Sequence, residues 1–383
     1  MTLLLLGCAA PQWESEVAPL LSEKCVSCHQ EGTVAPFPLV DPQTVASLAD
    51  SIVDSTASRR MPPWALDPDC QPTQDHLWLA DEELDLLSAW ADAGAVVDPE
   101  VPVELPPTPD SVRTDTLLEV EWTPVASPDD YRCFVVDPGF DEDVFLTAYE
   151  VEPGPQVHHV ILYSLDSEGA EPQADTLADE GDSYSCFGSS LVAESRPLAA
   201  WAPGTPPTRF PEGAGQRLLG GRRLVVQVHY YVETPVEEST GLRLEWEDSV
   251  DREMFTALLG DLSMELEPGL ESATADSTFS LDSYGLPIGV FVQGVFPHMH
   301  RRGRSLSLQS DREGQQTCLA EVPRWDFDWQ RLYLYEDPVY LYPDEQLRLS
   351  CTFDTTGDTE GVSWGDGTDD EMCLVGLMAT VSG

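Results

Sequence analysis

The strand signal and the metal-ligand signal of this chain meet in residues 288–300, which read Ile288-Gly289-Val290-Phe291-Val292-Gln293-Gly294-Val295-Phe296-Pro297-His298-Met299-His300. Residues 288–296 are mostly apolar and rich in β-branched and aromatic side chains, which predicts a buried β-strand. His298 and His300 follow, and side chains two positions apart in a strand point to the same face of the sheet. We therefore expect both imidazoles on one face, as two ligands of one metal ion require.

Similar strand-like runs fill the chain after residue 110, with turn residues between them. They cover residues 132–136, 144–151, 157–163, 224–231, 242–246, 347–353 and 373–381. Such a succession predicts two antiparallel β-sandwich domains of jelly-roll-like type. We place these domains at residues 113–247 and 248–383, with the joint between them within residues 247–253.

The first part of the chain, residues 12–98, has a helical pattern instead. Asp41 and Asp81 are candidate N-caps of two helices, and Gly94 is a candidate C-terminal stop. The apolar residues expected on one helix face are Val45, Leu48, Ile52 and Val53 in the first helix and Leu84, Leu87 and Trp90 in the second. Residues 99–112 are rich in proline and acid, so they should form an extended linker. The predicted fold class is multidomain, with a small all-α domain ahead of the two β-sandwiches.

The helical part carries the pattern Cys25-Val26-Ser27-Cys28-His29. In a Cys-X-X-Cys-His sequence, two thioethers attach a haem and the histidine becomes an axial ligand of its iron. Met61, in a proline-rich loop, is the expected second axial ligand because a thioether is a usual partner of such a haem, and His76 is the alternative. A redox or disulfide pair that happens to precede a histidine is the competing interpretation. These features predict a cytochrome c-like domain with one covalent c-type haem.

The charge of the chain excludes one class of partner. There are 69 acidic and 19 basic side chains, giving a formal net charge of −50. Such a charge repels nucleic-acid phosphates and anionic lipid head groups, so we expect no nucleic-acid partner. Hydrophobic residues make up 42% of the chain, which predicts a folded rather than a disordered protein.

Cysteine usage points to export. Nine cysteines are many for a reducing cytoplasm, and they indicate an oxidising compartment. Leu3-Leu4-Leu5-Leu6-Gly7-Cys8 resembles the end of a bacterial lipoprotein signal, with Cys8 as the lipidated residue and residues 1–11 as the signal remnant. We expect a periplasmic or cell-surface lipoprotein of a bacterium, held at the membrane only by this lipid anchor. The apolar run is too short for a complete signal, so an ordinary apolar N-terminus and a start further upstream both stay open.

Histidine is scarce in this chain and concentrated in a few places. Of seven histidines, five lie in three apolar runs, which hold His158-His159, His229 and the His298/His300 pair. Adjacent residues of a regular strand point to opposite faces, so His158 and His159 can bind one ion only where the strand bends or ends. Imidazole suits zinc, copper, iron and nickel, so the histidines alone leave the metal open.

Motifs around these histidines follow a recognisable order over residues 128–383: Asp130-Tyr131-Arg132-Cys133, Val157-His158-His159-Val160, Trp201-Ala202-Pro203 with Pro206-Pro207-Thr208-Arg209, Gln227-Val228-His229-Tyr230, the His298/His300 pair and Asp370-Glu371-Met372-Cys373. In this order they resemble the copper type II, ascorbate-dependent monooxygenases, the family of peptidylglycine α-hydroxylating monooxygenase and dopamine β-monooxygenase. Several motifs in sequence are far more specific than any one of them.

The resemblance implies two copper ions and a set of ligands for each. His158, His159 and His229 would hold the electron-accepting copper, whereas His298, His300 and Met372 would hold the copper that binds O2. The family disulfides that the resemblance implies are Cys133–Cys186 and Cys351–Cys373. Two further cysteines, Cys70 and Cys318, are left over, and the sequence leaves open whether they pair or stay free.

The chain departs from the family at two positions. Peptide-amidating members have an arginine two residues before the paired histidines and a tyrosine four residues after the copper methionine, and these residues grip a peptide carboxylate. This chain has Phe296 and Gly376 there. With Leu374 beside them, these residues predict a more apolar pocket and argue against glycine-extended peptides as substrates.

The function that follows is hydroxylation, with O2, of an accessible C–H bond in a small-molecule substrate. Each turnover needs two electrons, which ascorbate or an external donor acting through the fused haem would supply. The main rival is a haem and copper electron-transfer or copper-binding protein without hydroxylase activity. Zinc hydrolysis is a third interpretation, disfavoured because the sequence places no suitable acidic residue beside the histidines.

Overall fold

The computed structural model describes residues 10–31, 35–63, 66–74, 76–107, 109–179, 181–187, 189–202, 205–232, 234–281, 289–327, 329–365 and 370–381. The chain divides into two compact units. The smaller unit holds residues 1–64 and 75–108, and the larger unit holds residues 65–74 and 109–383. Among the helices of the described residues, none has the length and apolar character needed to span a membrane.

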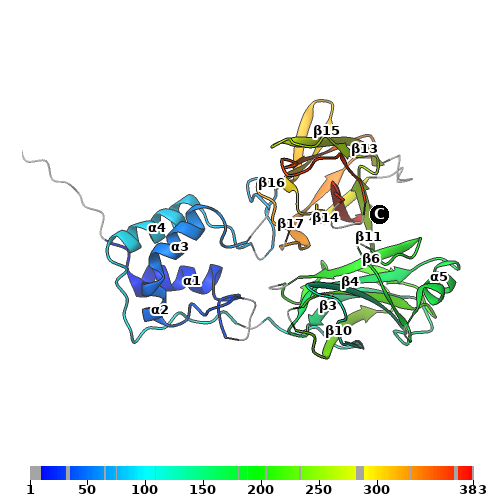
Figure 1. Ribbon diagram of the computed structural model, residues 1–383, viewed down its shortest axis with the longest axis horizontal. Helices are drawn as coiled ribbons and strands as arrows, with labels where there is room; N and C mark the ends of the chain where they lie inside the picture. Colours follow the sequence, from blue (N-terminus) through cyan, green and yellow to red (C-terminus); the bar gives the residue numbers. More distant parts are fainter. Residues whose placement is uncertain are drawn as a thin grey trace, which may run out of the picture. The chain divides into compact units, whose positions relative to one another are not determined.

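The smaller unit is helical. Its elements, blue to cyan in Figure 1, are the π-helix η1 (Trp13–Val17) and the α-helices α1 (Ala18–Lys24), α2 (Pro42–Ser47), α3 (Ala49–Ala57) and α4 (Asp81–Asp92). Their apolar faces pack into one core that includes Trp13, Leu21, Val45, Leu87 and Trp90. The helical region predicted for this part of the chain is therefore confirmed.

The helix ends differ from the prediction in two details. Asp41 caps α2 by accepting a hydrogen bond from the backbone N–H of Thr44 at 2.7 Å, but the helix stops at Ser47 and α3 begins anew at Ala49. Helix α4 begins at Asp81, yet its N-cap is Ala80, whose N–H donates to the Glu83 carboxylate at 2.7 Å. Gly94 follows α4 with a φ of 94°, the left-handed conformation expected of a helix stop.

The larger unit consists almost entirely of β-strands. Its elements are β1 (Thr116–Trp122), β2 (Asp129–Val136), β3 (Val144–Glu152), β4 (Val157–Leu165), α5 (Ala170–Leu177), β5 (Ser183–Ser185), β6 (Ser195–Trp201), β7 (Thr208–Arg209), β8 (Ala214–Leu218), β9 (Leu224–Tyr231), β10 (Glu238–Glu247), β11 (Arg252–Gly260), β12 (Glu265–Leu266), β13 (Ala273–Ser280), β14 (Val290–His298), β15 (Gly303–Arg312), β16 (Gln315–Val322), β17 (Tyr333–Leu341), β18 (Gln346–Phe353), β19 (Val362–Ser363) and β20 (Leu374–Val381). Each strand-like run predicted from the sequence overlaps one of these strands.

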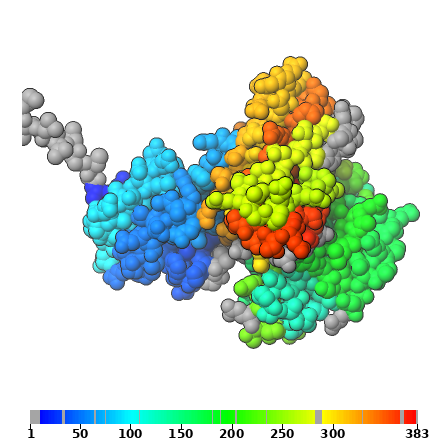
Figure 2. Space-filling model, turned by 45° about the horizontal axis from the view of Figure 1, so that its top comes forward, coloured from blue at the N-terminus to red at the C-terminus, as the bar shows by residue number. Residues whose placement is uncertain are grey.

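These strands form two halves, which Figure 2 shows as a mainly green lobe and a yellow to red lobe of the larger unit. In the N-terminal half, the five-stranded sheet β5-β2-β9-β4-β6 packs on β1, β10, β3 and β8. The core between them includes Leu146 and Leu242 on one layer and Leu162, Val226 and Val228 on the other. In the C-terminal half, β11, β20, β14 and β17 accompany the four-stranded sheet β13-β18-β15-β16.

The two halves share one sheet, which the sequence did not predict. A nine-stranded sheet runs β1-β10-β3-β8-β11-β20-β14-β17, with β7 beside β3. Strand β11 follows β10 after residues 248–251 and pairs with β8 in parallel, from Arg252 opposite Ala214 to Met254 opposite Gln216. The expectation of two purely antiparallel sandwiches is therefore wrong at this junction. The short link after β10 places β11 beside β8, so backbone pairing continues across the joint.

Residues 66–74, which lie between two stretches of the smaller unit in sequence, belong to the larger unit. The disulfide Cys70–Cys318 ties them to β16. Thr73 forms a backbone bridge with Tyr335 of β17, and the Gln71 side chain donates to the carbonyl of Cys318 at 2.8 Å. The two cysteines that the sequence left open are thus paired with each other.

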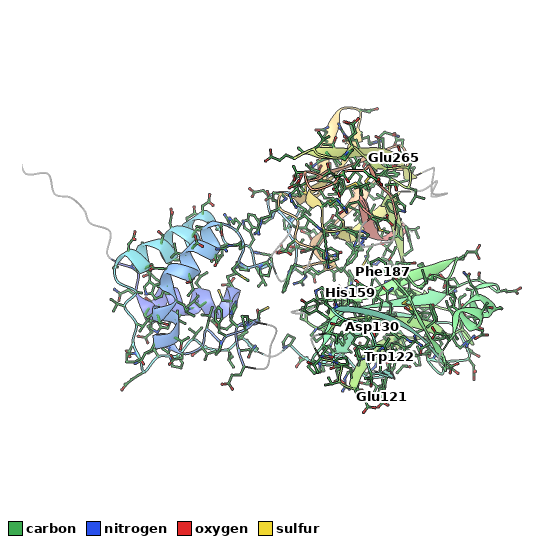
Figure 3. All side chains as sticks on the ribbon, viewed as in Figure 1. Glu121, Trp122, Asp130, His159, Phe187 and Glu265 are labelled. Atoms are coloured by element: carbon green, nitrogen blue, oxygen red, sulfur yellow. A yellow bond between two sulfur atoms is a disulfide. The ribbon has the colours of Figure 1, made fainter. Side chains whose placement is uncertain are left out.

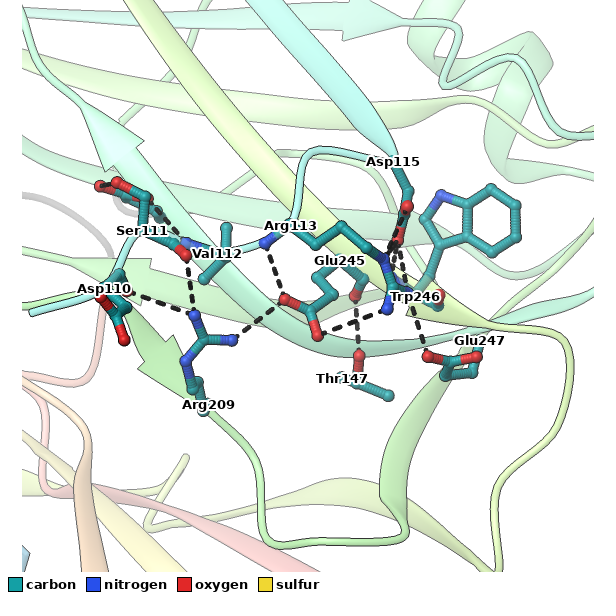
Figure 4. A network of polar contacts seen from close by, with 11 residues as sticks. Asp110, Ser111, Val112, Arg113, Asp115, Thr147, Arg209, Glu245, Trp246 and Glu247 are labelled. Carbon is teal, nitrogen blue, oxygen red and sulfur yellow. Dashed lines mark hydrogen bonds and ion pairs between the residues drawn. The ribbon is translucent and has the colours of Figure 1, made fainter.

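A polar network fixes the start of the β-rich chain (Figure 4). Arg209, part of one of the recognised motifs, donates to the Glu245 carboxylate at 3.0 Å and to the carbonyl of Ser111 at 2.9 Å. The backbone N–H of Arg113 donates to the same Glu245 carboxylate at 2.8 Å. Glu245 therefore joins the segment before β1 to the strands β7 and β10, so the role of Arg209 described here is structural.

Candidate metal centres

Three histidines converge on the neighbouring strands β4 and β9. His159 lies opposite His229 in the register of these strands, and the register shifts between Val157 and His159. His158 is the extra residue of this bulge, so two adjacent residues of β4 oppose one residue of β9. The candidate ligand atoms of the three rings lie within 4.8 Å of one another. Adjacent residues of a regular strand face opposite ways, but the bulge allows His158 and His159 to approach the same point. We refer to His158, His159 and His229 as the three-histidine centre.

The surroundings of the three-histidine centre favour the neutral form of its imidazoles, which is the form that binds a metal ion. Burial, with the neighbouring histidines, lowers the pKa of His229 to about 3 and holds that of His159 well below its usual value. These rings are therefore neutral at physiological pH, the form in which imidazole binds metals. The Nδ1 atoms of His159 and His229 are 3.3 Å apart, an approach that suits two ligands directed at one ion.

Two side chains orient the His229 ring. Its Nε2 atom donates to the Asp129 carboxylate at 2.9 Å, which leaves Nδ1 free of that role. The ring of Tyr131 stacks on it with centroids 4.0 Å apart. Asp129 also lies 3.9 Å from the guanidinium of Arg301, the residue that follows His300. The sequence did not single out Asp129, although it immediately precedes a recognised motif. Its carboxylate is engaged with the His229 ring, so it orients a candidate ligand.

His298 and His300 lie at the end of β14 with ring centroids 5.2 Å apart. His298 is the last residue of the strand, whereas His300 lies beyond it, so only the first is on a strand as predicted. The Nδ1 atom of His298 lies 2.6 Å from Oε1 of Gln330, and that of His300 lies 3.1 Å from the carbonyl of Asp370. With Nδ1 engaged on both rings, Nε2 remains as the ligand atom. Burial lowers the pKa of His298 to about 4, so this ring is also neutral.

A buried carboxylate connects this pair to Met372. Oε2 of Glu371 accepts the backbone N–H of His300 at 2.9 Å and that of Met372 at 3.2 Å, and Oε1 accepts the backbone N–H of Arg302 at 2.7 Å. Burial raises the pKa of Glu371, whereas these N–H groups oppose that rise. Glu371 therefore holds the segment after β14 beside the segment before β20. His298, His300 and Met372 are called the methionine centre below.

One small cavity lies between the two centres. It has a volume of about 80 Å³ and is lined by His158 and His159 on one side and by His298 and His300 on the other. Figure 3 labels His159 and Phe187, which lie close together at the edge of the green lobe. A second cavity, of about 590 Å³, borders His298 and Met372. Imidazoles and a buried thioether form a donor set that suits copper.

Disulfides accompany both centres. Cys133–Cys186 joins β2, the neighbour of β9, to the segment after β5, and Cys351–Cys373 joins β18 to the residue after Met372. These are the two pairs that the resemblance implied. Together with Cys70–Cys318 they indicate a protein that folds in an oxidising compartment.

In the smaller unit, the predicted haem residues are only partly brought together. Cys25 and Cys28 lie on one turn at the end of α1, and neither forms a disulfide with another described residue. The backbone N–H of His29 donates to the carbonyl of Cys25 at 3.0 Å. The Nδ1 atom of His29 lies 3.0 Å from the carbonyl of Phe37, which leaves Nε2 for iron. Met61 lies on the loop after α3 with 42% of its surface exposed, and His76 is also exposed. The prediction for Cys8 lies outside the described residues.

The geometry defines a β-sandwich protein in which three histidines converge on two paired strands, and a further histidine pair is joined to Met372 through Glu371. Residues 255–379 match the family model described as the C-terminal domain of the copper type II ascorbate-dependent monooxygenases. The dopamine beta-hydroxylase of Canis lupus familiaris is 25% identical over 57% of this chain and 39% of its own length. The peptidylglycine alpha-amidating monooxygenase of Rattus norvegicus is 27% identical over 65% of this chain and 25% of its own length. These similarities support a relationship between this chain and the copper type II ascorbate-dependent monooxygenase family.

The similarity has a limited extent. The chain spans 39% and 25% of the lengths of these two relatives, so it corresponds to only part of each. A third relative, a DBH-like monooxygenase protein 1 of Gallus gallus, is 27% identical over 58% of this chain and 39% of its own length. The matched family model ends at residue 379 and includes both paired histidines and Met372.

Proposed function

We propose that the chain is a copper-dependent monooxygenase that hydroxylates a C–H bond of a small molecule. The balanced reaction is R–H + O2 + 2 e⁻ + 2 H⁺ → R–OH + H2O. The observation that carries the proposal is the placement of His158 and His159 across one small cavity from His298 and His300. Bound copper supplies one-electron redox chemistry and the activation of O2.

The residues divide the work between the two centres. The three-histidine centre would hold a copper that stores an electron, since its all-imidazole ligands stand on two paired strands. The methionine centre would hold the copper at which O2 reacts, because His298 and Met372 border the cavity of about 590 Å³. Its thioether favours the reduced Cu(I) state. Phe296 lines both cavities.

The test is oxygen uptake by the copper-loaded full-length chain with ascorbate as reductant. A panel of small molecules under ¹⁸O2 should yield a product that contains one ¹⁸O atom. Met372→Leu removes the thioether and should bring coupled uptake down to the level of protein without added copper. Met254→Leu, another buried methionine, is the matched control and should leave uptake unchanged. Copper binding and reduction without any oxygenated product would favour the rival, an electron-transfer protein.

We propose that the smaller unit is a c-type cytochrome that supplies electrons. Cys25 and Cys28 would form the thioethers, His29 would be one axial ligand, and Met61 or His76 the other. The position of both cysteines on one turn and the engaged Nδ1 of His29 support this. Ascorbate stays an alternative donor, and membrane attachment through Cys8 of a bacterial lipoprotein stays part of the proposal.

A pyridine haemochrome assay tests this part of the proposal on protein expressed with a cytochrome c maturation system. One haem per chain is expected, with no haem in the variant Cys25→Ala/Cys28→Ala. Separate Met61→Ala and His76→Ala variants should identify the second ligand, since only one should change the low-spin spectrum. Absence of covalent haem from the parent chain would leave ascorbate as the donor and remove the cytochrome.

A further inference from the structure

The cavity of about 590 Å³ beside the methionine centre is large enough to hold a small molecule. It is bordered by His298 and Met372 and extends between the two halves of the larger unit. Binding sites for small molecules commonly have volumes of about 300–1,000 Å³. Its position next to two candidate ligands of one metal makes it the natural substrate site of the proposed oxygenase.

The floor of this cavity is one face of three adjacent strands, β11, β20 and β14. Gly376 of β20 lies opposite Leu258 of β11 and opposite Phe296 of β14. In the next row on the same face, Leu374 lies opposite His298. Alternate residues of a strand share a face, so the strand face that presents His298 also presents Leu258, Phe296 and Gly376.

The two positions at which the chain departs from the family are therefore cross-strand neighbours on the cavity floor. A Cβ atom added at Gly376 would lie 3.5 Å from Cβ of Phe296 and 3.6 Å from Cδ2 of Leu258. These are ordinary contact distances, so a methyl group fits, whereas a large side chain would occupy the cavity. Glycine at this position keeps the cavity open, and phenylalanine makes its wall apolar.

Charged residue types are absent from the described lining of the cavity. The described residues that line it include no aspartate, glutamate, lysine or arginine. An ion that entered would lose its hydration without gaining a countercharge from these residues. The net charge of −50 would oppose anions in addition.

The cavity also has apolar side chains that reach solvent. Leu262 is 74% exposed and Leu258 is 44% exposed, and both line the cavity. Exposed apolar side chains that continue into an apolar cavity are typical of an entrance for an apolar ligand.

We propose that the substrate is an uncharged, predominantly hydrocarbon small molecule that lies along the β11-β20-β14 face with a C–H bond beside His298 and Met372. This inference rests on the proposed monooxygenase function and names the substrate class of the same site. It predicts discrimination against both cations and anions of matched length.

The test is isothermal titration calorimetry of the full-length chain before copper is added, against 1-octanol, 1-octanesulfonate and octyltrimethylammonium, because bound copper would give the anion a countercharge. 1-Octanol should bind at least about tenfold more tightly than either ion, because an unpaired buried charge is costly. Equal or tighter binding of either ion would overturn the proposal.

Two variants locate the binding. Leu258→Arg should narrow or reverse the preference of 1-octanol over 1-octanesulfonate, whereas Leu270→Arg, at a leucine that is 40% exposed and does not line the cavity, should not. Gly376→Tyr should weaken 1-octanol binding at least about tenfold by filling the cavity. Circular dichroism verifies folding of each variant. Identical behaviour of Leu258→Arg and Leu270→Arg would overturn the proposal.

The outcome separates the two proposals. Binding is measured without electron supply, so a missing apolar preference in a protein that still consumes O2 removes the substrate class alone. Intact apolar preference in a protein that performs no oxygen chemistry removes the monooxygenase proposal alone.

Discussion

The two candidate metal centres are assembled in different ways. The three-histidine centre takes its residues from β4 and β9, which are hydrogen-bonded neighbours in one sheet, and a bulge at His158 completes it. The methionine centre takes its residues from the end of β14, the turn beyond it and the segment before β20, with Glu371 joining the backbones. Strand pairing with a bulge positions the first centre, whereas the buried carboxylate of Glu371 joins the backbone segments of the second.

The two centres also differ in the size of the cavities beside them. The three-histidine centre borders the cavity of about 80 Å³, whereas the methionine centre borders that cavity and also the one of about 590 Å³. Electron storage needs a rigid ligand set and no room for substrate. Substrate oxidation needs space beside the metal. The structural difference between the two centres therefore matches the proposed division of labour.

The largest expected effect comes from breaking the carboxylate of the methionine centre. Glu371→Ala removes the acceptor of three backbone N–H groups, and each unsatisfied buried group costs about 1–3 kcal/mol. We expect the free energy of unfolding in urea to fall by about 3 kcal/mol or more, and copper to be lost from the methionine centre alone. The Glu371→Gln variant should have a free energy of unfolding and a copper content at the methionine centre that lie between those of Glu371→Ala and those of the parent chain. Equal copper loss from both centres would show that the carboxylate is not specific to one.

One disulfide accompanies each centre, so each centre can be perturbed separately. Removing either bridge should lower the free energy of unfolding by about 2–4 kcal/mol. Cys351→Ala/Cys373→Ala should weaken copper binding mainly at the methionine centre, because the bridge holds the residue after Met372. Cys133→Ala/Cys186→Ala should act mainly on the three-histidine centre. Chelator competition with EPR readout measures both, and an identical pattern for the two variants would contradict this assignment.

A substitution at Asp129 tests the three-histidine centre separately from the methionine centre. Asp129→Asn weakens the hydrogen bond that orients His229, and the loss of such a partner typically reduces metal affinity about 10–100-fold. Copper affinity should fall at this centre and stay unchanged at the methionine centre, as measured by competition with a chelator. Asp115→Asn, at a carboxylate paired with Arg113 in the β1 region, is the control and should change neither centre. A uniform loss of affinity at both centres would count against the role of Asp129.

Gln330 gives the corresponding but smaller effect on the methionine side. Its Oε1 lies 2.6 Å from Nδ1 of His298, and Gln330→Ala removes this partner. His300 and Met372 keep their own contacts, so we expect a loss of affinity of about tenfold at this centre, near the lower end for an orienting residue. The same competition assay measures it. An effect on the three-histidine centre as large as that on the methionine centre would be inconsistent with the structure.

Much of the fold followed from sequence periodicity. Strand runs such as residues 224–231 were recognisable because apolar and β-branched residues are continuous there, and the helix stop at Gly94 because glycine tolerates positive φ. The parallel pairing of β11 with β8 could not be predicted, since it depends on the packing of both halves rather than on either strand.

The candidate site was predictable in its ligands and not in its supports. His158 and His159 appeared incompatible as ligands because a regular strand alternates, and a bulge has no reliable signal in one sequence. Asp129, Gln330 and the clamping role of Glu371 depend on distances between segments far apart in the chain. Acidic residues are so frequent here that no pattern separated Asp129 from the others.

X-ray absorption spectroscopy on the copper-loaded, ascorbate-reduced full-length chain tests the central claim most directly. Two coppers per chain are expected, with a copper–sulfur contribution that disappears in Met372→Leu while the imidazole contributions of His158, His159 and His229 persist. A single copper per chain, or a copper–sulfur contribution that survives Met372→Leu, would contradict the account.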